Sequence, residues 1–303
     1  MNAKPRLNLF RDYARRRWGR WVGKIILSTG IRCPNRDLGG CIYCSASSFR
    51  PTYLQEGDPV AAQLAGGKAY LRTLDTQLFF GCFQQETSTA GNFDALVEQA
   101  AIPLRDPDCA GLAISTRPDQ VTDAGLRRLR DALQCAPDKP VIIELGLQSA
   151  REDTLRFLNR NHTLRDFVET AALVKGHPRF ELGAHLILGI PGESMSDMRR
   201  SVQQVVESGI GHLKLHHLQV VKDTPLSELY QKSPFPLPNF DEYLAMLCEL
   251  IPFIPRPVVI HRLWSTARKD LLCQPRWLIN SGQLLGRLLR LLEQKNLAQG
   301  QAA

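Results

Sequence analysis

The stretch Cys33-Pro-Asn-Arg-Asp-Leu-Gly-Gly-Cys41-Ile-Tyr-Cys44 decides the fold of this chain. It places three of the eight cysteines in a loop that contains proline and glycine and follows the strand-like run 24–28. Thiolates packed this closely suit a thiophilic metal or an iron–sulfur cluster. A closed zinc site or an ordinary four-iron cluster needs four ligands, and the next cysteine and the first histidine are Cys82 and His162. Three ligands leave one coordination position open, and open positions are where metal chemistry takes place.

Two other interpretations of the loop stay open at this point. Cys-x-x-Cys also occurs in zinc and redox sites, so a three-cysteine zinc site completed by a distant histidine is an alternative. Three unrelated structural cysteines are a weaker one, because buried structural cysteines favour packed elements. The other five cysteines are dispersed, which indicates neither a second cluster nor a disulfide framework and fits reduced thiols in the cytoplasm. They are Cys82, Cys109, Cys135, Cys248 and Cys273.

The cysteine loop resembles the cluster-binding loop of the radical S-adenosylmethionine (radical SAM) enzymes. In that family three cysteines hold three irons of a 4Fe-4S cluster, and the fourth iron binds S-adenosyl-L-methionine (SAM). The spacer between Cys33 and Cys41 is longer than the usual first spacer of the family. A long first spacer resembles the YhcC-type subgroup, which is related to the elongator catalytic subunit, although the spacer of that subgroup is longer still. The resemblance extends from about Arg16 to Trp277. It implies Cys33, Cys41 and Cys44 as metal ligands, a 4Fe-4S cluster and SAM as cofactors, and an electron donor of the flavodoxin or ferredoxin class.

Strand-like and helical patterns alternate six times along the chain. The expected strands are 24–28, 77–83, 111–115, 140–147, 181–188 and 212–221. Helices are expected between them, with Asp58, Asn92, Thr122 and Ser194 as N-caps. Because the strands are apolar on both faces, the pattern predicts an α/β protein with a parallel sheet covered by helices. An incomplete (β/α)6, TIM-like barrel is the core fold of the resembled family, and a flat doubly wound sheet is the alternative.

Length and composition predict one core domain with an extension. We expect a basic lead-in over 1–23, the core barrel over 24–232, an extension packed on the core over 233–297 with a helix at 241–250 and a strand at 258–262, and a disordered tail over 298–303. No apolar run approaches the roughly 18 residues that a transmembrane helix needs. No secretory signal pattern is present, so we expect a cytoplasmic protein without a membrane partner.

The positive charge is concentrated near the N-terminus. The formal net charge is +8, and residues 4–24 contain eight basic residues against the single acid Asp12. Tyr13, Trp18 and Trp21 are interleaved with them, a composition that suits phosphate contact and base stacking. An organelle presequence and a solvated helix face are the alternatives. The RNA interpretation assigns the contact to Arg15, Arg16, Arg17 and Arg20.

Polar candidates for the site follow the ends of the second and third strands, where ligands of parallel sheets gather. The resemblance implies that Gln84 and Thr87 occupy the position that holds the amine of SAM, although the family's Gly-Gly-Glu motif is missing. Arg117 could bind a carboxylate or phosphate with two hydrogen bonds. Alternatively it belongs to a helix-entry turn in which Asp119 makes a local bond.

The fourth strand gives Glu144-Leu-Gly-Leu-Gln148-Ser149, followed by Arg160-Asn-His162-Thr. This run resembles the elongator subunit and oxygen-independent coproporphyrinogen oxidase, whose strand residues face the barrel interior. By strand alternation Glu144 and Gln148 share one face. A buried acid needs a partner, so we expect Glu144 to face the cofactor or a cation such as Arg117. Gln148 and Ser149 are candidates for binding the ribose of SAM, and His162 is expected to be structural.

The remaining candidates come from the later strands. The turn Gly189-Ile-Pro191-Gly-Glu matches the position that packs against adenine in the resembled family. Lys214, His216, His261 and Arg262 are polar where buried strands should be apolar, so we assign them to the substrate side as candidate catalytic residues. Satisfied core histidines and a solvated basic strip are the alternative.

Together these patterns predict a radical SAM enzyme. The expected reaction is reductive cleavage of SAM to a 5′-deoxyadenosyl radical that abstracts hydrogen from a substrate. Transfer RNA is the favoured substrate, because of the basic N-terminus and the elongator-like stretch. The alternatives are a small metabolite or tetrapyrrole, or a non-catalytic, zinc-stabilised protein that binds nucleic acid.

Overall fold

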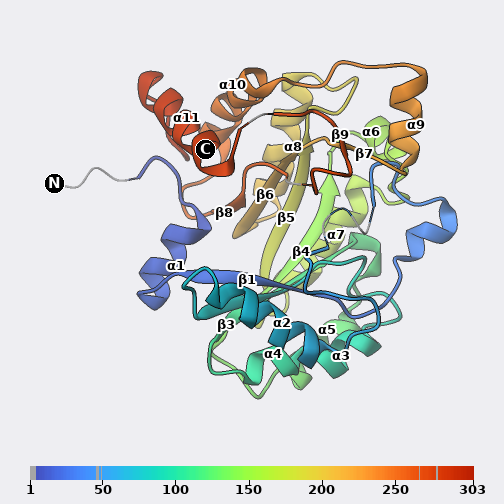
Figure 1. Ribbon diagram of the computed structural model, residues 1–303, viewed down its shortest axis with the longest axis vertical. Helices are drawn as coiled ribbons and strands as arrows, with labels where there is room; N and C mark the ends of the chain where they lie inside the picture. Colours follow the sequence, from blue (N-terminus) through green and yellow to red (C-terminus); the bar gives the residue numbers. More distant parts are fainter. Residues whose placement is uncertain (1–4, 46–47, 49, 266, 278) are drawn as a thin grey trace.

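The central feature of the structure is a curled sheet of seven parallel strands (Figure 1). The structure is a computed structural model, and it describes residues 5–45, 48, 50–265, 267–277 and 279–303. The strands lie in the sheet in sequence order: β1 (Val22–Leu27), β2 (Leu78–Phe83), β3 (Cys109–Thr116), β4 (Val141–Gln148), β5 (Glu181–Leu188), β6 (His212–His217) and β8 (Val259–Arg262). Each connection therefore advances the chain by one strand, as in a barrel, without the reversal of a doubly wound sheet. The prediction of an incomplete barrel is confirmed.

Helices cover the outer face of the curled sheet. They are α2 (Val60–Arg72), α3 (Asp94–Gln99), α4 (Ala101–Arg105), α5 (Asp123–Ala132), α6 (Glu152–Phe157), α7 (Leu164–Lys175) and α8 (Met195–Glu207). Along β4, Ile143, Leu145 and Leu147 belong to the large core between sheet and helices. The alternate residues Ile142 and Glu144 face the barrel interior. Strand alternation thus separates an apolar layer from an interior that can hold polar groups.

The seventh strand comes from the segment that the sequence assigns to an extension. β8 pairs in parallel with β6, with His212 opposite Val259 and Leu213 opposite Ile260. The expected boundary between 232 and 233 therefore cuts through the barrel, because β6 still needs a neighbour at the edge of the sheet. The expected strand 212–221 is also divided in two. Its last part, β7 (Val220–Val221), leaves the main sheet and pairs antiparallel with β9 (Leu272–Gln274).

The basic lead-in is part of the barrel. Helix α1 (Phe10–Trp18) packs under the amino-terminal half of the strands. The ring centroids of Phe10 and Trp18 lie 5.6 and 6.3 Å from that of Phe80. Phe10 and Phe80 belong to a second apolar cluster inside the barrel, with Cys82, Ile142 and Val259. We call this cluster, together with α1, the floor. The boundary expected at residue 23 is therefore wrong, because the apolar side of α1 fills the amino-terminal end of the barrel.

The C-terminal tail is also ordered, contrary to prediction. The C-terminal segment adds three helices: α9 (Pro225–Lys232) packs against β7, and α10 (Phe240–Leu250) packs against α11 (Ser281–Gln294) (Figure 1). Beyond α11, Gln299 is only 3% exposed. Its side chain donates to the carbonyls of Pro255 and Val258 at 2.9 and 2.7 Å and accepts from the amide of Asn8 at 2.7 Å. The side chain of Gln299 thus fixes the tail, because it provides hydrogen-bond partners for backbone groups of Asn8, Pro255 and Val258.

Two of the four expected N-caps are confirmed. The hydroxyls of Thr122 and Ser194 accept the amides of Gly125 and Asp197 at 3.1 and 3.2 Å. Asp58 and Asn92 are not N-caps. Pro59 occupies the N-cap position of α2, and Asn92 lies in a left-handed turn before α3, with φ of 56°. Over the described ranges, no helix combines the length and the apolar character needed to cross a membrane.

Candidate functional site

The three clustered cysteines lie at the carboxyl end of the strands. The short 3-10 helix η1 (Pro34–Leu38) follows Cys33, and Gly39 and Gly40 then turn the chain at φ values of 89° and 72°. These left-handed positions suit glycine, and they bring Cys41 and Cys44 back beside the start of the loop. Cys33, Cys41 and Cys44 line one wall of a cavity of about 410 Å³. All three thiols are free, as expected for metal ligands.

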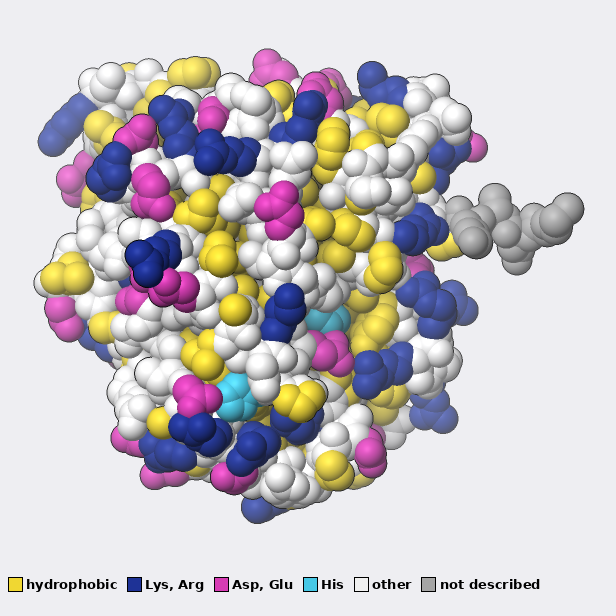
Figure 2. All heavy atoms as spheres, turned by 180° about the vertical axis from the view of Figure 1, so that it is seen from behind, with side chains coloured by type: hydrophobic (Ala, Val, Ile, Leu, Met, Phe, Trp, Pro, Cys, Tyr) yellow, Lys and Arg dark blue, Asp and Glu magenta, His cyan; other side chains and the backbone are white. Residues whose placement is uncertain are grey.

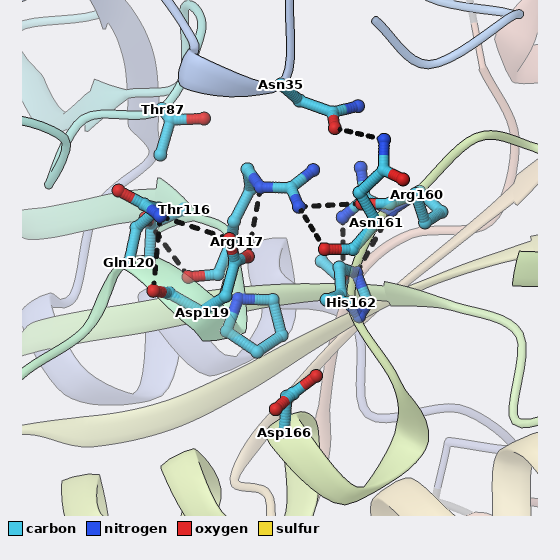
Figure 3. Close-up of polar contacts among 12 residues, drawn as sticks. Asn35, Thr87, Thr116, Arg117, Asp119, Gln120, Arg160, Asn161, His162 and Asp166 are labelled. Carbon is cyan, nitrogen blue, oxygen red and sulfur yellow. Dashed lines mark hydrogen bonds and ion pairs between the residues drawn. The ribbon is translucent and has the colours of Figure 1, made fainter. Parts of the chain in front are cut away.

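The segment after α6 clamps the cysteine loop. The side-chain amide of Asn35 donates to Cys41 Sγ at 3.2 Å and to the carbonyl of Asn159 at 2.8 Å. Asn161 donates to Asn35 Oδ1 at 2.8 Å, as Figure 3 shows, and Asn159 donates to the carbonyl of Gly40 at 2.7 Å. Asn159 and Asn161 both have φ near 50°, which asparagine tolerates better than most residues. The resemblance singled out this segment, but not its role as a support.

The segment after β2 holds the other end of the loop. Glu86 accepts the backbone amide of Cys33 at 3.0 Å and forms an ion pair with Arg36 at 2.7 Å. Thr87 donates its hydroxyl to Cys33 Sγ at 3.0 Å. Thr87 was expected to hold the amine of SAM; it lines the cavity, and its side chain contacts a cysteine. Gln84 lines the cavity, which is compatible with the expected role.

Arg160 supplies positive charge to the cysteine loop. Its guanidinium is buried and donates to Cys41 Sγ at 3.2 Å, to Tyr43 Oη at 3.4 Å and to the carbonyl of Gly146 at 2.6 Å. Arg160 and Asn35 thus both donate to the sulfur of Cys41, which the fold holds with two hydrogen bonds. Arg160 also donates to His162 Nε2 at 3.1 Å, so His162 has the structural role expected of it (Figure 3).

Arg117 makes the local contact with Asp119 that the helix-entry turn predicts. Its side chain is 5% exposed, and its Nε lies 2.9 Å from Asp119 Oδ1, the local bond of a helix-entry turn. Its Nη2 donates to the carbonyls of Arg160 and Asn161 at 2.6 and 3.2 Å (Figure 3). Its Nη1 and Gln148 Oε1 are buried and, within the described ranges, have no hydrogen-bond partner. Both side chains line the cavity, so these atoms are available to a polar ligand.

The polar groups around the cavity fit a 4Fe-4S cluster and SAM. Thr87, Asn35 and Arg160 provide hydrogen-bond donors to Cys33 and Cys41, as cluster sulfurs require. In the described parts of the chain, no three His, Cys, Asp or Glu side chains converge on a single ion. In a 4Fe-4S cluster each cysteine binds a different iron. Three thiols that line one cavity without meeting at a single point are therefore compatible with it. The unpartnered atoms of Arg117 and Gln148 suit the polar groups of SAM, and the residues therefore fit both groups.

Glu144 has a different partner from the one expected. It accepts from Lys214 Nζ and from Ser115 Oγ, both at 2.6 Å, and within the described ranges it forms no hydrogen bond or ion pair with Arg117. Burial by itself would raise the pKa of Glu144, but the charge and hydrogen bond of Lys214 outweigh it and lower this pKa to about 2. Glu144 and Lys214 therefore form a buried, charged pair across the barrel interior.

Three predicted cofactor contacts lie away from the cavity wall. At the end of β4, Gln148 has φ of 78°, which interrupts the strand alternation and turns Ser149 out of the cavity. The hydroxyl of Ser149 is hydrogen-bonded to Glu193 and accepts the amide of Arg151 at 3.0 Å. At Gly189, φ is 74°, and an added Cβ would lie 2.8 Å from Pro238. Neither Gly189 nor Pro191 lines the cavity of the cysteines. The positions of these three residues therefore do not support their assignment to SAM.

The substrate-side candidates separate into two groups. Lys214, His216 and Arg262 line a second cavity of about 170 Å³, which shares Tyr43 and His185 with the cysteine cavity. His261 does not line it. The pairing of β6 with β8 shifts between Leu213 and Lys214, which sets Arg262 opposite Lys214. His261 instead lies in the floor, 2.8 Å from His212 and 3.2 Å from Lys24.

Sequence reasoning missed several residues of the site, namely Asn35, Tyr43, Glu86, Arg160 and His185. His185 had a usable signal, because strand alternation from Gly183 places it on the interior face of β5. The other four come from loops, where no periodic pattern indicates which way a side chain points.

Comparisons with known proteins agree with this geometry. Residues 27–205 match the family model of the Radical SAM superfamily, and residues 210–291 match the Radical_SAM C-terminal domain. The chain is 31% identical over 284 residues to protein YhcC of Escherichia coli K12, covering 92% of this chain and 90% of that one. It is 28% identical over 306 residues to the uncharacterized protein YtqA of Bacillus subtilis, covering 99% and 93%.

A solved structure shows the same fold. Elp3 from the archaeon Methanocaldococcus infernus matches with a TM-score of 0.67 at 17% identity, covering 92% of this chain and 64% of that chain. The chain therefore belongs to the radical SAM superfamily and is an enzyme. Within that superfamily it falls in the YhcC-type subgroup, as its cysteine loop predicts.

Proposed function

We propose that Cys33, Cys41 and Cys44 hold a 4Fe-4S cluster and that SAM binds beside it in the 410 Å³ cavity. When bound, the reduced cluster would supply the electron that cleaves SAM to methionine and a 5′-deoxyadenosyl radical, which takes a hydrogen atom from the substrate. The observation that carries this proposal is the convergence of three free thiols on one cavity wall, with hydrogen-bond donors at Cys33 and Cys41.

The chain's own residues would prepare this chemistry. Glu86 and Asn35 fix the two ends of the cysteine loop, and Arg160 places positive charge at Cys41. Arg117 Nη1 and Gln148 Oε1 would bind polar groups of SAM. The substrate would enter from the adjoining 170 Å³ cavity, where little water competes with the radical. A flavodoxin or ferredoxin would donate the electron, and eight free cysteines fit a reducing, cytoplasmic compartment.

The test is anaerobic purification followed by iron and sulfide analysis, and then assay of 5′-deoxyadenosine after adding dithionite and SAM. We expect a brown protein that forms 5′-deoxyadenosine, and loss of both properties in Cys41→Ala. Cys135→Ala, which removes an exposed cysteine outside the loop, is the matched control and should retain both. A colourless protein that holds about one zinc would contradict the proposal and support a structural zinc site.

Transfer RNA is the second candidate, as a substrate that contacts α1. Arg15, Arg16, Arg17 and Arg20 are exposed, and Arg15 stacks over Trp21 at 5.3 Å. Figure 2 shows Lys and Arg side chains gathered below the grey N-terminal residues, on the side where Figure 1 places α1. This surface lies at the opposite end of β1 from the cysteine loop, and six strand residues span about 20 Å. An RNA bound to both would have to follow the outside of the barrel.

The RNA proposal is tested by removing charge without removing the floor. Deletion of α1 would unfold the barrel, so we would use the triple variant Arg15→Gln, Arg16→Gln, Arg20→Gln. Its matched control is Arg127→Gln, Arg128→Gln, Arg130→Gln on the exposed face of α5. We expect the first triple variant to weaken tRNA binding and to flatten its salt dependence. Equal tRNA affinity in both triple variants would remove α1 from the RNA interpretation and favour a small metabolite or a tetrapyrrole.

A further inference from the structure

The 170 Å³ cavity lies against the last three strands of the main sheet, and loops and neighbouring strands complete its lining. β5 contributes His185 and Ile187, β6 contributes Lys214 and His216, and β8 contributes Arg262. The cavity adjoins the cysteine cavity, because His185 and Gln148 line both. Its volume is below the range of about 300–1,000 Å³ that is typical of pockets for whole drug-sized ligands. It therefore has room for one functional group of a substrate that reaches toward the cysteine loop.

The charges of this cavity do not balance. Lys214 is neutralised by Glu144 at 2.6 Å, and Glu144 is also occupied by Ser115. Across the described ranges, no carboxylate lies within ion-pair distance of Arg262, whose contact is His216 Nε2 at 3.5 Å. Burial lowers the pKa of Arg262, but a guanidinium stays protonated in proteins. The cavity thus keeps one positive charge without a counter-ion.

Three histidines line this cavity, and none of them supplies a negative charge. The pKa of His217 is lowered to about 3 by burial, and the other two are His185 and His216. Burial, with repulsion from Lys214, lowers the pKa of His185 to about 3, and burial lowers that of His216 well below its usual value. Both are neutral near pH 7. Arg262 can only donate, so His216 Nε2 accepts, and its Nδ1 proton is then donated to His185 Nε2 at 2.9 Å. This chain of hydrogen bonds orients Arg262 from one side and leaves its other donors free.

We propose that this cavity binds an anionic oxygen-bearing group of the substrate, a carboxylate or a phosphate, through the guanidinium of Arg262. Arg262 is partly buried and has no counter-ion among the described residues, and the planar donors of a guanidinium match two oxygens of either group. The proposal rests on the proposed function in one respect only, that the group belongs to the substrate. It makes the substrate an acidic small molecule, anchored beside the cavity in which SAM would bind.

The first experiment measures anion binding without catalysis. The melting temperature of the anaerobic holoenzyme is compared in potassium phosphate, potassium glutarate and potassium chloride at equal ionic strength. We expect phosphate or glutarate to raise it by about 2 °C when present at roughly ten times its dissociation constant. Arg262→Gln should abolish the rise and Arg262→Lys should reduce it. Arg165→Gln, an exposed arginine on α7, should leave it unchanged. An equal rise in Arg262→Gln, or no rise with either anion, would overturn the proposal.

The second experiment identifies the source of the anion. A small-molecule extract freed of RNA is divided by anion exchange, and each fraction is added to the holoenzyme with SAM and dithionite. We expect the retained fraction to stimulate 5′-deoxyadenosine formation in the wild type and in Arg165→Gln, but not in Arg262→Gln. Loss of the stimulation after phosphatase treatment assigns a phosphate, and its persistence assigns a carboxylate. Stimulation by the unretained fraction or by RNA alone would overturn the proposal.

The two experiments separate this inference from the proposed function. If no 5′-deoxyadenosine forms under any condition while the anion-dependent rise is lost in Arg262→Gln, the proposed function fails and the anion site stands. If 5′-deoxyadenosine forms but the rise does not depend on Arg262, the anion site fails and the proposed function stands.

Discussion

At the carboxyl end of β2, the chain presents Gln84, Glu86 and Thr87 to the cysteine cavity, whereas the middle of the same strand presents Phe80 to the aromatic rings of α1. The strands thus carry polar groups toward the cysteine loop, and apolar groups toward the floor. In barrels of this type the carboxyl end commonly carries chemistry and the amino end carries stability. The contrast teaches that variants at the two ends should fail in different ways.

The floor is not wholly apolar, and its polar groups also differ from those of the site. Lys24 contacts His261, His261 contacts His212, and His212 contacts Glu181 at 2.5 Å, which makes a continuous chain. Each of these groups has a partner within the chain itself. Near the cysteine loop, by contrast, Arg117 Nη1 and Gln148 Oε1 are buried without a hydrogen-bond partner in the described part of the chain. Unsatisfied groups mark the end that binds ligands, and satisfied groups mark the end that only folds.

The largest expected effect is at the cysteine loop. Cys41→Ser should abolish cluster binding, because Cys41 is the thiol whose sulfur accepts hydrogen bonds from both Asn35 and Arg160. The melting temperature of the apoprotein should change little, since Cys41 is only half-buried. Iron content, visible absorption and thermal unfolding of the apoprotein measure the two effects. Cluster content equal to the wild type would contradict the assignment of this ligand.

The next effect is at the buried pair that joins β4 and β6. Lys214→Met should lower the free energy of unfolding by about 3–5 kcal/mol, because it leaves Glu144 charged and unpaired in the barrel. The double variant Glu144→Gln, Lys214→Met should recover much of this loss. Urea denaturation of the wild type, the two single variants Glu144→Gln and Lys214→Met, and the double variant, analysed as a double-mutant cycle, provides the measurement. Additive effects of the two substitutions would contradict a coupled pair.

At the floor, Phe10→Ala should cost about 3 kcal/mol of stability through the cavity left beside Phe80. Iron content after reconstitution at low temperature should equal that of the wild type, because α1 touches no residue of the cysteine loop. Tyr70→Ala, which truncates a 49% exposed ring on α2, is a control of similar chemistry. A Phe10→Ala protein that folds normally but cannot hold the cluster would break the division between the two ends.

The smallest effect concerns Lys24 and pH. Burial, with repulsion from Lys214, lowers the pKa of Lys24 from 10.5 to about 7 in the folded protein. The unfolded chain therefore binds the proton more tightly between pH 7 and 10.5, so this group makes stability rise with pH across that interval. Lys24→Met should flatten the rise. Urea midpoints at pH 7, 8 and 9 measure it, and an unchanged slope would contradict the lowered pKa.

Local patterns were sufficient for part of the fold and part of the site. The strands 181–188 and 111–115 were found because their apolar residues form short runs between turn signals, and the cluster of three cysteines was recognised because its spacing is itself the signal. Partners were not found in this way. Glu144 could be recognised as a buried acid that needs a cation. The sequence offers both Arg117 and Lys214 as that cation and cannot choose between them. Only the curl of the sheet brings β6 across from β4 and pairs Glu144 with Lys214.

The sequence by itself determined the alternation of strands and helices and the clustering of three thiols, because each depends on residues that are neighbours along the chain. The alternation left a barrel and a flat doubly wound sheet both open, and the order in which the strands pair decided for the barrel. Only the tertiary structure decided that α1 forms the floor, that β8 completes the sheet and that Gln299 holds the tail. It also decided that Gln148 turns Ser149 away from the cavity and that Arg262 is left without a counter-ion. These features depend on contacts between residues far apart in the chain, for which a single sequence carries no periodic signal.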